Sequence, residues 1–368
     1  MEQKAVLVHS AEYHRFDLGR DHPLRMYRLK LTVDLMEAMG VFPSDVVEPS
    51  PADLDTLTLF HSRDYLDALQ RAETQGVTAP EMGIGAPDNP IFEGCFTMPR
   101  MSVDGTCKAV SIALDGSRTF HMGGGMHHAH PERASGFCYL NDPVLGIMKA
   151  AEQGAKVLYL DIDAHHGDGV QEAFYDNPQV FTLSIHQYSP GFFPGTGGID
   201  EMGEGKGRGY AVNLPLPPHT EDESYWWAYQ EVFLPSLEKF APDLLFVQFG
   251  VDGHRDDPLA SLYLSTYLYE RLAKDLVERW KGPLAVVGGG GYDMVNVARI
   301  WTMAWGVLSD ATLPELLPDS FLRISTMSGY DGPYLHDIPG WSGEVVSEDV
   351  KETVRRLKRA HPMFQGAS

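Results

Sequence analysis

The chain has 368 residues, of which 43% are hydrophobic and 22% charged, as is ordinary for a soluble globular protein that buries a sizeable core. Its 51 acidic residues outnumber its 29 basic residues, which gives a formal net charge of −22. This balance argues against general nucleic-acid binding and against attachment to anionic membranes, because both need a basic surface. It is compatible with a cationic substrate, and equally with a charge that serves only solubility.

The cysteines and the first residues give no sign of export. The three cysteines, Cys95, Cys107 and Cys138, form no CxxC pair, so neither a disulfide framework nor a thiolate zinc site is indicated. The start of the chain, MEQKAVLVHS, lacks the pattern of a signal peptide, and no apolar run is long enough to cross a membrane. We therefore expect a cytoplasmic protein. The absence of repeats and linkers favours one domain over 1–368.

The first third of the chain predicts a strand, a helix and a long loop. KAVLVHS (4–10) is typical of a short buried strand, and RMYRLKLTVDLMEAMG (25–40) has apolar residues at helical spacing before a terminating glycine. Residues 79–106 are rich in Gly, Pro and Asp, and they predict a long loop that leads into a helix around 104–115.

The middle of the chain alternates between apolar runs and helical patterns. The runs end in polar residues or glycines; they are AKVLYLDID (155–163), QVFTLSIHQ (179–187), PDLLFVQFGVDGH (242–254) and GPLAVVGGGGYD (282–293). Helical patterns occupy 224–240 and 266–280. This alternation predicts a mostly parallel sheet with helices on both faces. Ligands bind such sheets outside the carboxyl ends of the strands, which is where the polar residues lie.

The stretch YLDIDAHHGDGV (159–170) holds the densest group of chemically active side chains. It could be only a polar turn after a strand. However, zinc takes His nitrogen and Asp oxygen, and a catalytic zinc site uses three protein ligands and an open position. Asp163 and His165 can point to one side of a strand end, and Asp252 can supply the third ligand from another strand. A metal held there would lower the pKa of a water molecule and polarise a carbonyl.

A second cluster lies upstream, in HMGGGMHHAHPERASGFCYLND (121–142). Its histidines His127 and His128 follow a glycine run, which allows the backbone to approach a ligand closely. Asp161 and Asp168 can each orient one imidazole, because a carboxylate behind a histidine fixes its tautomer and raises its basicity. Tyr292 follows four glycines, where its hydroxyl can donate to a developing oxyanion. Packing beside a flexible turn is the alternative for this tyrosine taken alone.

Five blocks follow one another along the chain and are specific as a set. They are GGMHHAHPERASGFCYLND, YLDIDAHHGDGVQEAFY, SIHQYSPGFFPGTGGIDEMGEGKGRGYAVNLPLP, FGVDGHRDDPLASLYLS and GGGGYD. Together they resemble the zinc-dependent histone deacetylase family, most closely its class I enzymes and the bacterial acetoin-utilisation-type deacetylases. The resemblance extends from DHPLRMYRLKL to RIWTMAW. It implies the arginase-like α/β fold, with a central parallel sheet of eight strands and helices on both faces.

The resemblance also assigns the metal site and the oxyanion donor. It implies zinc on Asp163, His165 and Asp252, the same three residues that the metal chemistry suggests. Ferrous iron is compatible with the same ligands. Tyr292 would then bind the oxyanion of a tetrahedral intermediate.

The two histidines receive separate roles from the resemblance. His127 would lie against Asp161, and His128 against Asp168. His128 would be the main general base and then the general acid, whereas His127 would act largely through its charge.

The resemblance further implies a narrow channel for an acyl-lysine side chain. Phe137 and Phe193 would form its walls, and the Gly136 carbonyl would accept the substrate amide N–H. Asp88 matches a rim aspartate that holds the substrate backbone. Leu259 matches an apolar position at the mouth of the channel.

Other implied positions are a cavity and two potassium sites. Gly290 belongs with the substrate-binding residues, and Arg28 matches an arginine that lines an internal cavity for acetate. One potassium site would use Asp161, Asp163, His165, Ser184 and Ile185. The second would use carbonyls near Phe174, Asn177, Val180 and Tyr210.

Several positions depart from the family pattern or carry no role. Met126 stands where many relatives have tryptophan, and residues 11–21 and 79–90, which would form the rim, match only loosely. Residues after about 312 show no feature tied to chemistry and lack the long tail of corepressor-binding relatives, which favours a stand-alone enzyme. Cys138 is expected to be buried. Four histidines are expected in turns or on the surface: His130, His186, His219 and His254.

The sequence thus predicts a metal-dependent amidohydrolase that acts on N-ε-acyl-lysine in a protein or peptide, with no nucleic-acid or membrane partner. The acyl group and the oligomeric state are left open. The nearest alternative is an acetylpolyamine amidohydrolase, whose mouth must fit a slender dication, but Leu259 offers no charge there. A binuclear arginase-like ureohydrolase needs further aspartates, and Asp161 and Asp168 are committed to histidines. An acyl-lysine-binding module with a dead site is disfavoured because the expected catalytic positions are intact.

Overall fold

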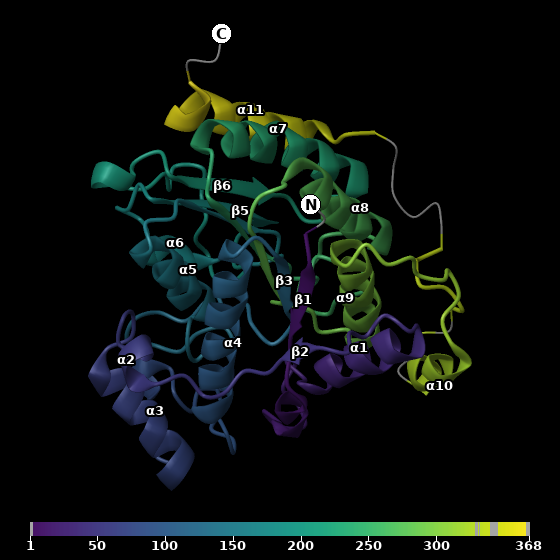
Figure 1. Ribbon diagram of the computed structural model, residues 1–368. Coiled ribbons are helices and arrows are strands. Elements are labelled where there is room, and N and C mark those ends of the chain that lie inside the picture. Colours follow the sequence, from purple (N-terminus) through teal and green to yellow (C-terminus); the bar gives the residue numbers. More distant parts are fainter. Residues whose placement is uncertain (1–2, 328–329, 331, 339–344, 366–368) are drawn as a thin grey trace.

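The computed structural model describes residues 3–327, 330, 332–338 and 345–365, so the expected domain span of 1–368 includes residues outside this description. Its centre is an eight-stranded sheet in the order β2-β1-β3-β8-β7-β4-β5-β6, in which every neighbouring pair is parallel (Figure 1). The strands are β1 (Ala5–Val8), β2 (Val46–Val47), β3 (Arg118–His121), β4 (Val157–Asp161), β5 (Val180–Gln187), β6 (Ala211–Leu216), β7 (Leu244–Gln248) and β8 (Leu284–Val287). The predicted eight-stranded parallel sheet is confirmed.

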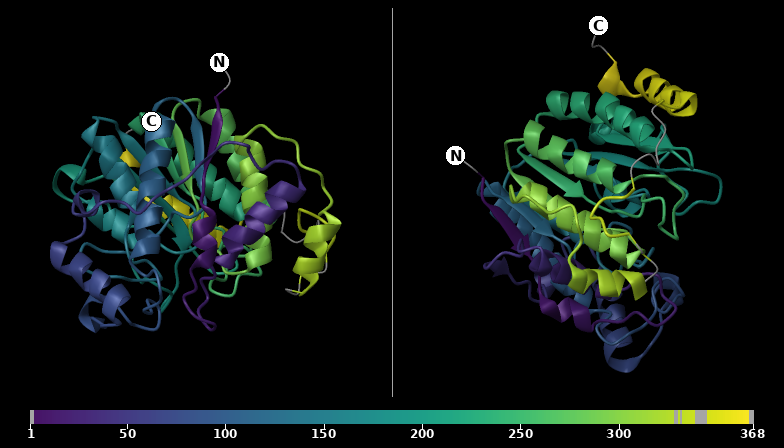
Figure 2. Two further views of the ribbon diagram at one scale, coloured as in Figure 1. Left: turned by 60° about the horizontal axis from the view of Figure 1, so that its bottom comes forward. Right: turned by 90° about the vertical axis from the view of Figure 1, so that its right-hand side faces the viewer.

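Helices cover both faces of this sheet, as predicted. They are α1 (Tyr27–Ala38), α2 (Leu54–Leu57), α3 (Arg63–Gln75), α4 (Thr97–Leu114), α5 (Asp142–Glu152), α6 (Asp168–Ala173), α7 (Asp222–Phe240), α8 (Thr266–Arg279), α9 (Met294–Leu308), α10 (Asp319–Met327) and α11 (Glu348–Ala360). Figures 1 and 2 show α4 and α5 on one face and α1, α9, α8 and α7 on the other, with α11 along the edge beside β6 and α7. In the described parts of the chain, no helix combines the length and the apolar character that crossing a bilayer requires.

The central strands are apolar because both of their faces are covered. All residues of β4, β5, β7 and β8 are buried, as expected for parallel strands between two helical layers. In β4, Leu158 and Leu160 pack into the larger core cluster, whereas Val157 and Tyr159 pack against α4, α5 and α6. This alternation follows from the two-residue period of a strand. Helices packed on both faces of the sheet therefore fix the position at which each central strand ends.

The strand order brings the polar ends together. β3, β8, β7 and β4 are consecutive neighbours in the middle of the sheet. The histidine cluster follows β3, the glycine run with Tyr292 follows β8, Asp252 follows β7, and the aspartate–histidine stretch follows β4. Segments separated by more than a hundred residues in the sequence thus meet at one edge.

Some element predictions were wrong. The loop expected over 79–106 ends early, because α4 begins at Thr97. Pro99 lies in its first turn, where proline is tolerated, and Gly105 allows close contact with His121, since a Cβ there would lie 2.4 Å from the imidazole Cε1. Pro99 and Gly105 suggested a loop, but Pro99 belongs to the first turn of α4 and Gly105 lets the helix pack against His121. β2, β3 and β6 were not predicted, because they are short or, in β6, include a proline at the sheet edge.

A buried ion pair fastens the segment after α10 to helix α9. Arg299 and Asp337 lie 2.8 Å apart, with 0% and 1% of their side chains exposed. Asp337 also accepts hydrogen bonds from the Thr266 N–H at 2.8 Å and from His254 Nε2 at 3.0 Å. Although burial opposes it, the contacts with His254 and Arg299 hold the pKa of Asp337 well below its ordinary value. His254 is buried, so a surface position was wrong, but it lies within the turns around 252–256, as the prediction of a turn allowed.

Asp337→Asn should lower the free energy of unfolding by about 3–5 kcal/mol, because it leaves the charge of Arg299 buried without a counter-charge. Urea denaturation followed by circular dichroism measures this loss. Glu223→Gln is the control: Glu223 pairs with Arg271 at 2.7 Å and both side chains are exposed, at 42% and 45%, so its loss should be about 0–1 kcal/mol. Equal losses in the two variants would contradict the account of this anchor.

Candidate metal and catalytic site

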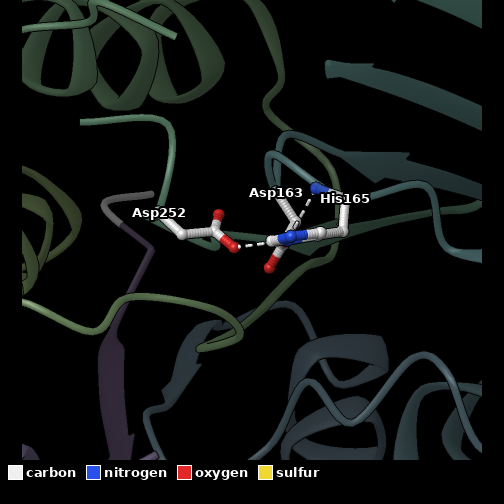
Figure 3. Close-up of side chains that lie close together, drawn as sticks. All are labelled: Asp163, His165 and Asp252. Carbon is white, nitrogen blue, oxygen red and sulfur yellow. Dashed lines mark hydrogen bonds and ion pairs between the residues drawn. The ribbon is translucent and has the colours of Figure 1, made fainter. Parts of the chain in front are cut away.

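Three buried side chains converge where β4 and β7 end. Asp163 and His165 lie on the loop after β4, and Asp252 lies on the loop after β7 (Figure 3). Their potential ligand atoms are all within 4.8 Å of one another. His165 Nδ1 is 2.8 Å from Asp252 Oδ2 and 3.4 Å from Asp163 Oδ1. The fold thus brings together the three residues that the sequence suggested as metal ligands.

The chemistry of this group fits a divalent metal. Burial alone would lower the pKa of His165, but hydrogen bonds to Asp163 and Asp252 raise it to about 10. The two buried carboxylates, Asp163 and Asp252, need a positive charge nearby to offset their own. Without a metal, a proton on His165 provides that charge. A metal bound to the three ligands provides the same compensation. Backbone N–H groups of Gly290 and Ala164 donate to outer oxygens of Asp163 and Asp252, at 2.7 and 2.8 Å, and orient both carboxylates.

Two histidines lie beside the metal group, each with a carboxylate behind it. His127 Nδ1 is 2.8 Å from Asp161 Oδ2, and His128 Nδ1 is 2.7 Å from Asp168 Oδ1. The centroids of the two imidazole rings are 3.9 Å apart. In both rings the carboxylate engages Nδ1, so Nε2 remains for other contacts.

The environments of the two histidines separate their protonation states. Burial favours the neutral form of His127, yet the charges of Asp161 and Asp163 outweigh it and raise the pKa of His127 to about 9. Burial, together with the neighbouring His127, lowers the pKa of His128 to about 4. At neutral pH His128 is therefore the ring that can accept a proton.

Further residues that fix this arrangement were missed from the sequence. The Tyr159 hydroxyl donates to Asp161 Oδ2 at 2.7 Å, and both residues point to the same side of β4. Asp142, at the start of α5, accepts hydrogen bonds from the backbone N–H groups of Gly125 and Met126 at 2.9 and 2.8 Å. The signal for Tyr159 was present, because it stands two positions before Asp161 in a strand. Nothing local to Asp142 marks its partner.

A channel of about 220 Å³ leads to these groups. It is lined by Asp88, His128, Gly136, Phe137, His165, Phe193, Leu259 and Tyr292. A side chain at Gly136 would collide with the channel, since a Cβ there would lie 2.7 Å from His128 Cδ2 and 2.9 Å from the Phe193 ring. Phe137 has a φ of 68°, a conformation that bulky residues rarely adopt outside functional sites. The structure thus brings the predicted channel residues together around His128 and Tyr292.

The other predicted positions lie outside the channel lining, and the second potassium set lies at the opposite, amino end of β5. Gly290 contacts the metal group through its N–H, as described above. Arg28 is buried, lies 5.0 Å from the Trp301 ring centroid and donates to the Gly291 carbonyl at 2.8 Å.

In the first predicted potassium set, Ser184 of β5 pairs with Asp161 of β4, and Ile185 follows it. In the second set, Phe174, Asn177, Val180 and Tyr210 cluster where α6 leads into β5. Both potassium sites stay predictions.

The remaining histidines divide into two groups. His219 is exposed and His130 partly exposed, near Asp168 and Glu172. His186 is fully buried, with Nδ1 2.9 Å from the Ser184 hydroxyl and Nε2 3.1 Å from the Gly197 carbonyl. Its predicted surface position was wrong because β5 continues through Gln187. Cys138 is buried as predicted, and burial raises its thiol pKa well above the ordinary value.

Comparisons with known proteins agree with this geometry. Residues 22–308 match the Histone deacetylase domain. The chain is 40% identical over 313 residues to the acetoin utilization protein AcuC of Bacillus subtilis (strain 168), an alignment that covers 82% of this chain and 81% of that protein. The chain belongs to the histone deacetylase family. A second member, histone deacetylase 8 of Xenopus tropicalis, is 37% identical over 322 residues, covering 85% of this chain and 86% of the relative.

Solved structures of the histone deacetylase family share the fold. An HDAC homolog crystallised in complex with SAHA has a TM-score of 0.90 and 34% identity, with 96% of this chain and 100% of that chain covered. An HDAC homolog from Aquifex aeolicus has a TM-score of 0.89 and 35% identity at the same coverage. Membership in the histone deacetylase family makes this chain a hydrolase of the deacetylase type. The family depends on a metal, and the buried Asp-His-Asp group fits such a site.

Zinc added to the metal-free protein should raise its melting temperature, because a ligand that binds only the folded chain stabilises it. At a hundredfold excess over Kd the gain is about 2.7 kcal/mol. Differential scanning fluorimetry measures the shift. Asp252→Asn should abolish it, whereas Asp256→Asn, a change of an exposed neighbour with 53% of its side chain accessible, should keep it. A shift that survives Asp252→Asn would contradict the proposed ligands.

Proposed function

We propose that this protein is a zinc-dependent lysine deacylase, which hydrolyses the amide of N-ε-acyl-lysine in proteins or peptides to lysine and a carboxylate. One observation carries the proposal: the Asp163–His165–Asp252 group, a neutral His128 and Tyr292 meet at one narrow channel. A channel of this kind suits a long unbranched side chain whose amide must reach buried groups. The names of the relatives, AcuC and histone deacetylase 8, are consistent with this reaction class.

Zinc is the proposed metal because one nitrogen and two oxygen ligands leave an open position for chemistry. When bound, it polarises the amide carbonyl and lowers the pKa of a water molecule toward neutrality. Ferrous iron suits the same ligands and is the alternative. Asp163 and Asp252 are held by backbone N–H groups, so the site is shaped before a metal arrives.

The two histidines divide the proton work in this proposal. His128, neutral and backed by Asp168, takes a proton from the attacking water as the water oxygen bonds to the carbonyl carbon. The C–N bond then breaks, and His128 returns that proton to the leaving lysine amine. His127, held charged by Asp161, keeps a positive charge near the developing negative charge.

Tyr292 is the proposed oxyanion donor. It lines the channel beside Phe137, with the two rings in edge-to-face contact and their centroids 5.6 Å apart. Burial raises the pKa of its hydroxyl well above the ordinary value, so the hydroxyl keeps its proton and can donate it in a hydrogen bond. The channel walls Phe137 and Phe193 would hold the lysine stem, while Asp88 and the Gly136 carbonyl would fix the substrate amides.

An acetylpolyamine amidohydrolase is the second candidate, because it would use the same fold and metal group. The mouth of the channel favours the lysine substrate: Leu259 is apolar, and among the described residues Asp88 is the one acid that lines the channel. A binuclear hydrolase would need carboxylates that Asp161 and Asp168 have already committed to His127 and His128. Potassium binding and a cytoplasmic location stay predictions from the sequence.

Tyr292→Phe should lower kcat by about 10²- to 10³-fold while KM changes little, because it removes a hydrogen bond that forms mainly in the transition state. Steady-state hydrolysis of an acetyl-lysine peptide by the zinc-loaded enzyme measures both constants. Tyr188→Phe is the control, since Tyr188 is 43% exposed and lies outside the channel lining. Unchanged turnover in Tyr292→Phe would rule out its role as an oxyanion donor.

Acyl-lysine peptides should be better substrates than N-acetylspermidine. We expect kcat/KM to favour the peptide by at least about tenfold, because the polyamine's second cation finds no carboxylate at Leu259. Acetyl, propionyl, butyryl, crotonyl and lactyl peptides rank the acyl groups in the same assay. Leu259→Glu should shift the ratio toward the polyamine. A wild-type enzyme that hydrolyses only acetylspermidine would move the protein to the polyamine branch.

A further inference from the structure

Asp257 lies on the loop after β7, two residues before Leu259, and contacts the loop that carries Tyr292. It is buried, with 7% of its surface exposed. Its Oδ1 accepts a hydrogen bond from the Leu259 N–H at 2.9 Å, and its Oδ2 accepts one from the Tyr292 N–H at 2.7 Å. One carboxylate therefore joins the loop after β7 to the loop after β8 through their main chains.

The loop before Tyr292 depends on such contacts because glycine gives it little conformational preference. Gly289 and Gly291 have φ values of 134° and 141°, which suit glycine and leave the backbone without side-chain packing. Gly290 is tied at its carbonyl to the Val251 N–H at 2.8 Å. The Tyr292 N–H has Asp257 as its acceptor, so this carboxylate controls the point from which the tyrosine side chain extends.

The position of Asp257 is itself fixed relative to the loop after β7 that carries the proposed metal ligand Asp252 (the metal loop). Its N–H donates to the His254 carbonyl at 2.9 Å, and His254 stands two residues after Asp252 in the sequence. A shift of the loop after β7 would therefore move the carboxylate, and with it the backbone of Tyr292. Leu259 and Tyr292 both line the channel, so the mouth and the hydroxyl donor share one support.

We propose that Asp257 is a positioning residue that sets the reach of the Tyr292 hydroxyl and couples it to the mouth of the channel at Leu259. This inference rests on the proposed function, in which Tyr292 donates to the oxyanion. The side chain of Asp257 suits this place because each of its oxygens accepts one backbone N–H, whereas the amide of asparagine would turn an N–H₂ toward one of these two donors. Asp257 acts through Tyr292 and does not touch the substrate.

The first experiment compares Asp257→Asn with Asp256→Asn in the zinc-loaded, full-length enzyme on an acetyl-lysine peptide. We expect Asp257→Asn to lower kcat by about 10- to 100-fold with KM within about threefold, because a displaced donor weakens only the transition state. Asp256→Asn makes the same carboxyl-to-amide change at the preceding, exposed residue and should match the wild type. The zinc-induced melting shift should be the same in both variants, which shows that the metal group is intact.

The decisive measurement repeats the substitution in the Tyr292→Phe background. If Asp257 acts through the tyrosine hydroxyl, Asp257→Asn should lower kcat less than about twofold further once that hydroxyl is gone. A purely structural role would lower kcat by the same factor in both backgrounds. If Asp257→Asn melts below the assay temperature, Asp257→Glu takes its place: it keeps both oxygens but shifts them by one methylene, and its loss must likewise vanish in the Tyr292→Phe background.

The outcomes separate the two proposals. A wild type without activity on any acyl-lysine peptide overturns the proposed function. An active wild type with undiminished kcat in Asp257→Asn, or with equal losses in both backgrounds, overturns only the role of Asp257.

Discussion

The charge balance at the carboxyl end of the sheet is the constraint on which the rest of the site depends. Four carboxylates are buried or nearly buried there: Asp161, Asp163, Asp168 and Asp252. Removing a carboxylate from water is costly unless a cation or several donors compensate it. Two of the four have a histidine each, and the other two share His165 in a group suited to a metal. The contacts that compensate the buried carboxylates are also the ones that provide the neutral base His128, the charged His127 and the group of metal ligands.

The sequence predicted most of this centre because the relevant signals are local. Apolar runs that end in polar residues indicated β4, β5, β7 and β8. The ligand preferences of zinc indicated Asp163, His165 and Asp252 independently of any family resemblance. The misses share a different cause. Pro99 and Gly105 look like loop residues until their packing is known, and His186 looks like a turn residue until β5 is seen to continue through it.

Long-range partners escaped the sequence for a related reason. His254 and Asp337 are 83 residues apart, and Asp257 meets Tyr292 across 35 residues. No spacing or periodicity encodes such a contact, since it exists only once two strand ends have been placed side by side. Sequence reasoning therefore identified the groups with chemical roles, whereas the structure was needed to find the residues that hold them in place.

The anchor formed by Asp337 has a consequence for how the chain reaches its active form. The match to the family domain ends at residue 308, yet the buried counter-charge of Arg299 in the described part of the chain is Asp337. On the ribosome, the nascent chain exposes β7 and its metal loop long before residue 337 emerges. His254, next to that loop, then has no carboxylate partner at Asp337. A fragment that stops at residue 308 would therefore leave both Arg299 and His254 without the carboxylate that they contact in the folded chain.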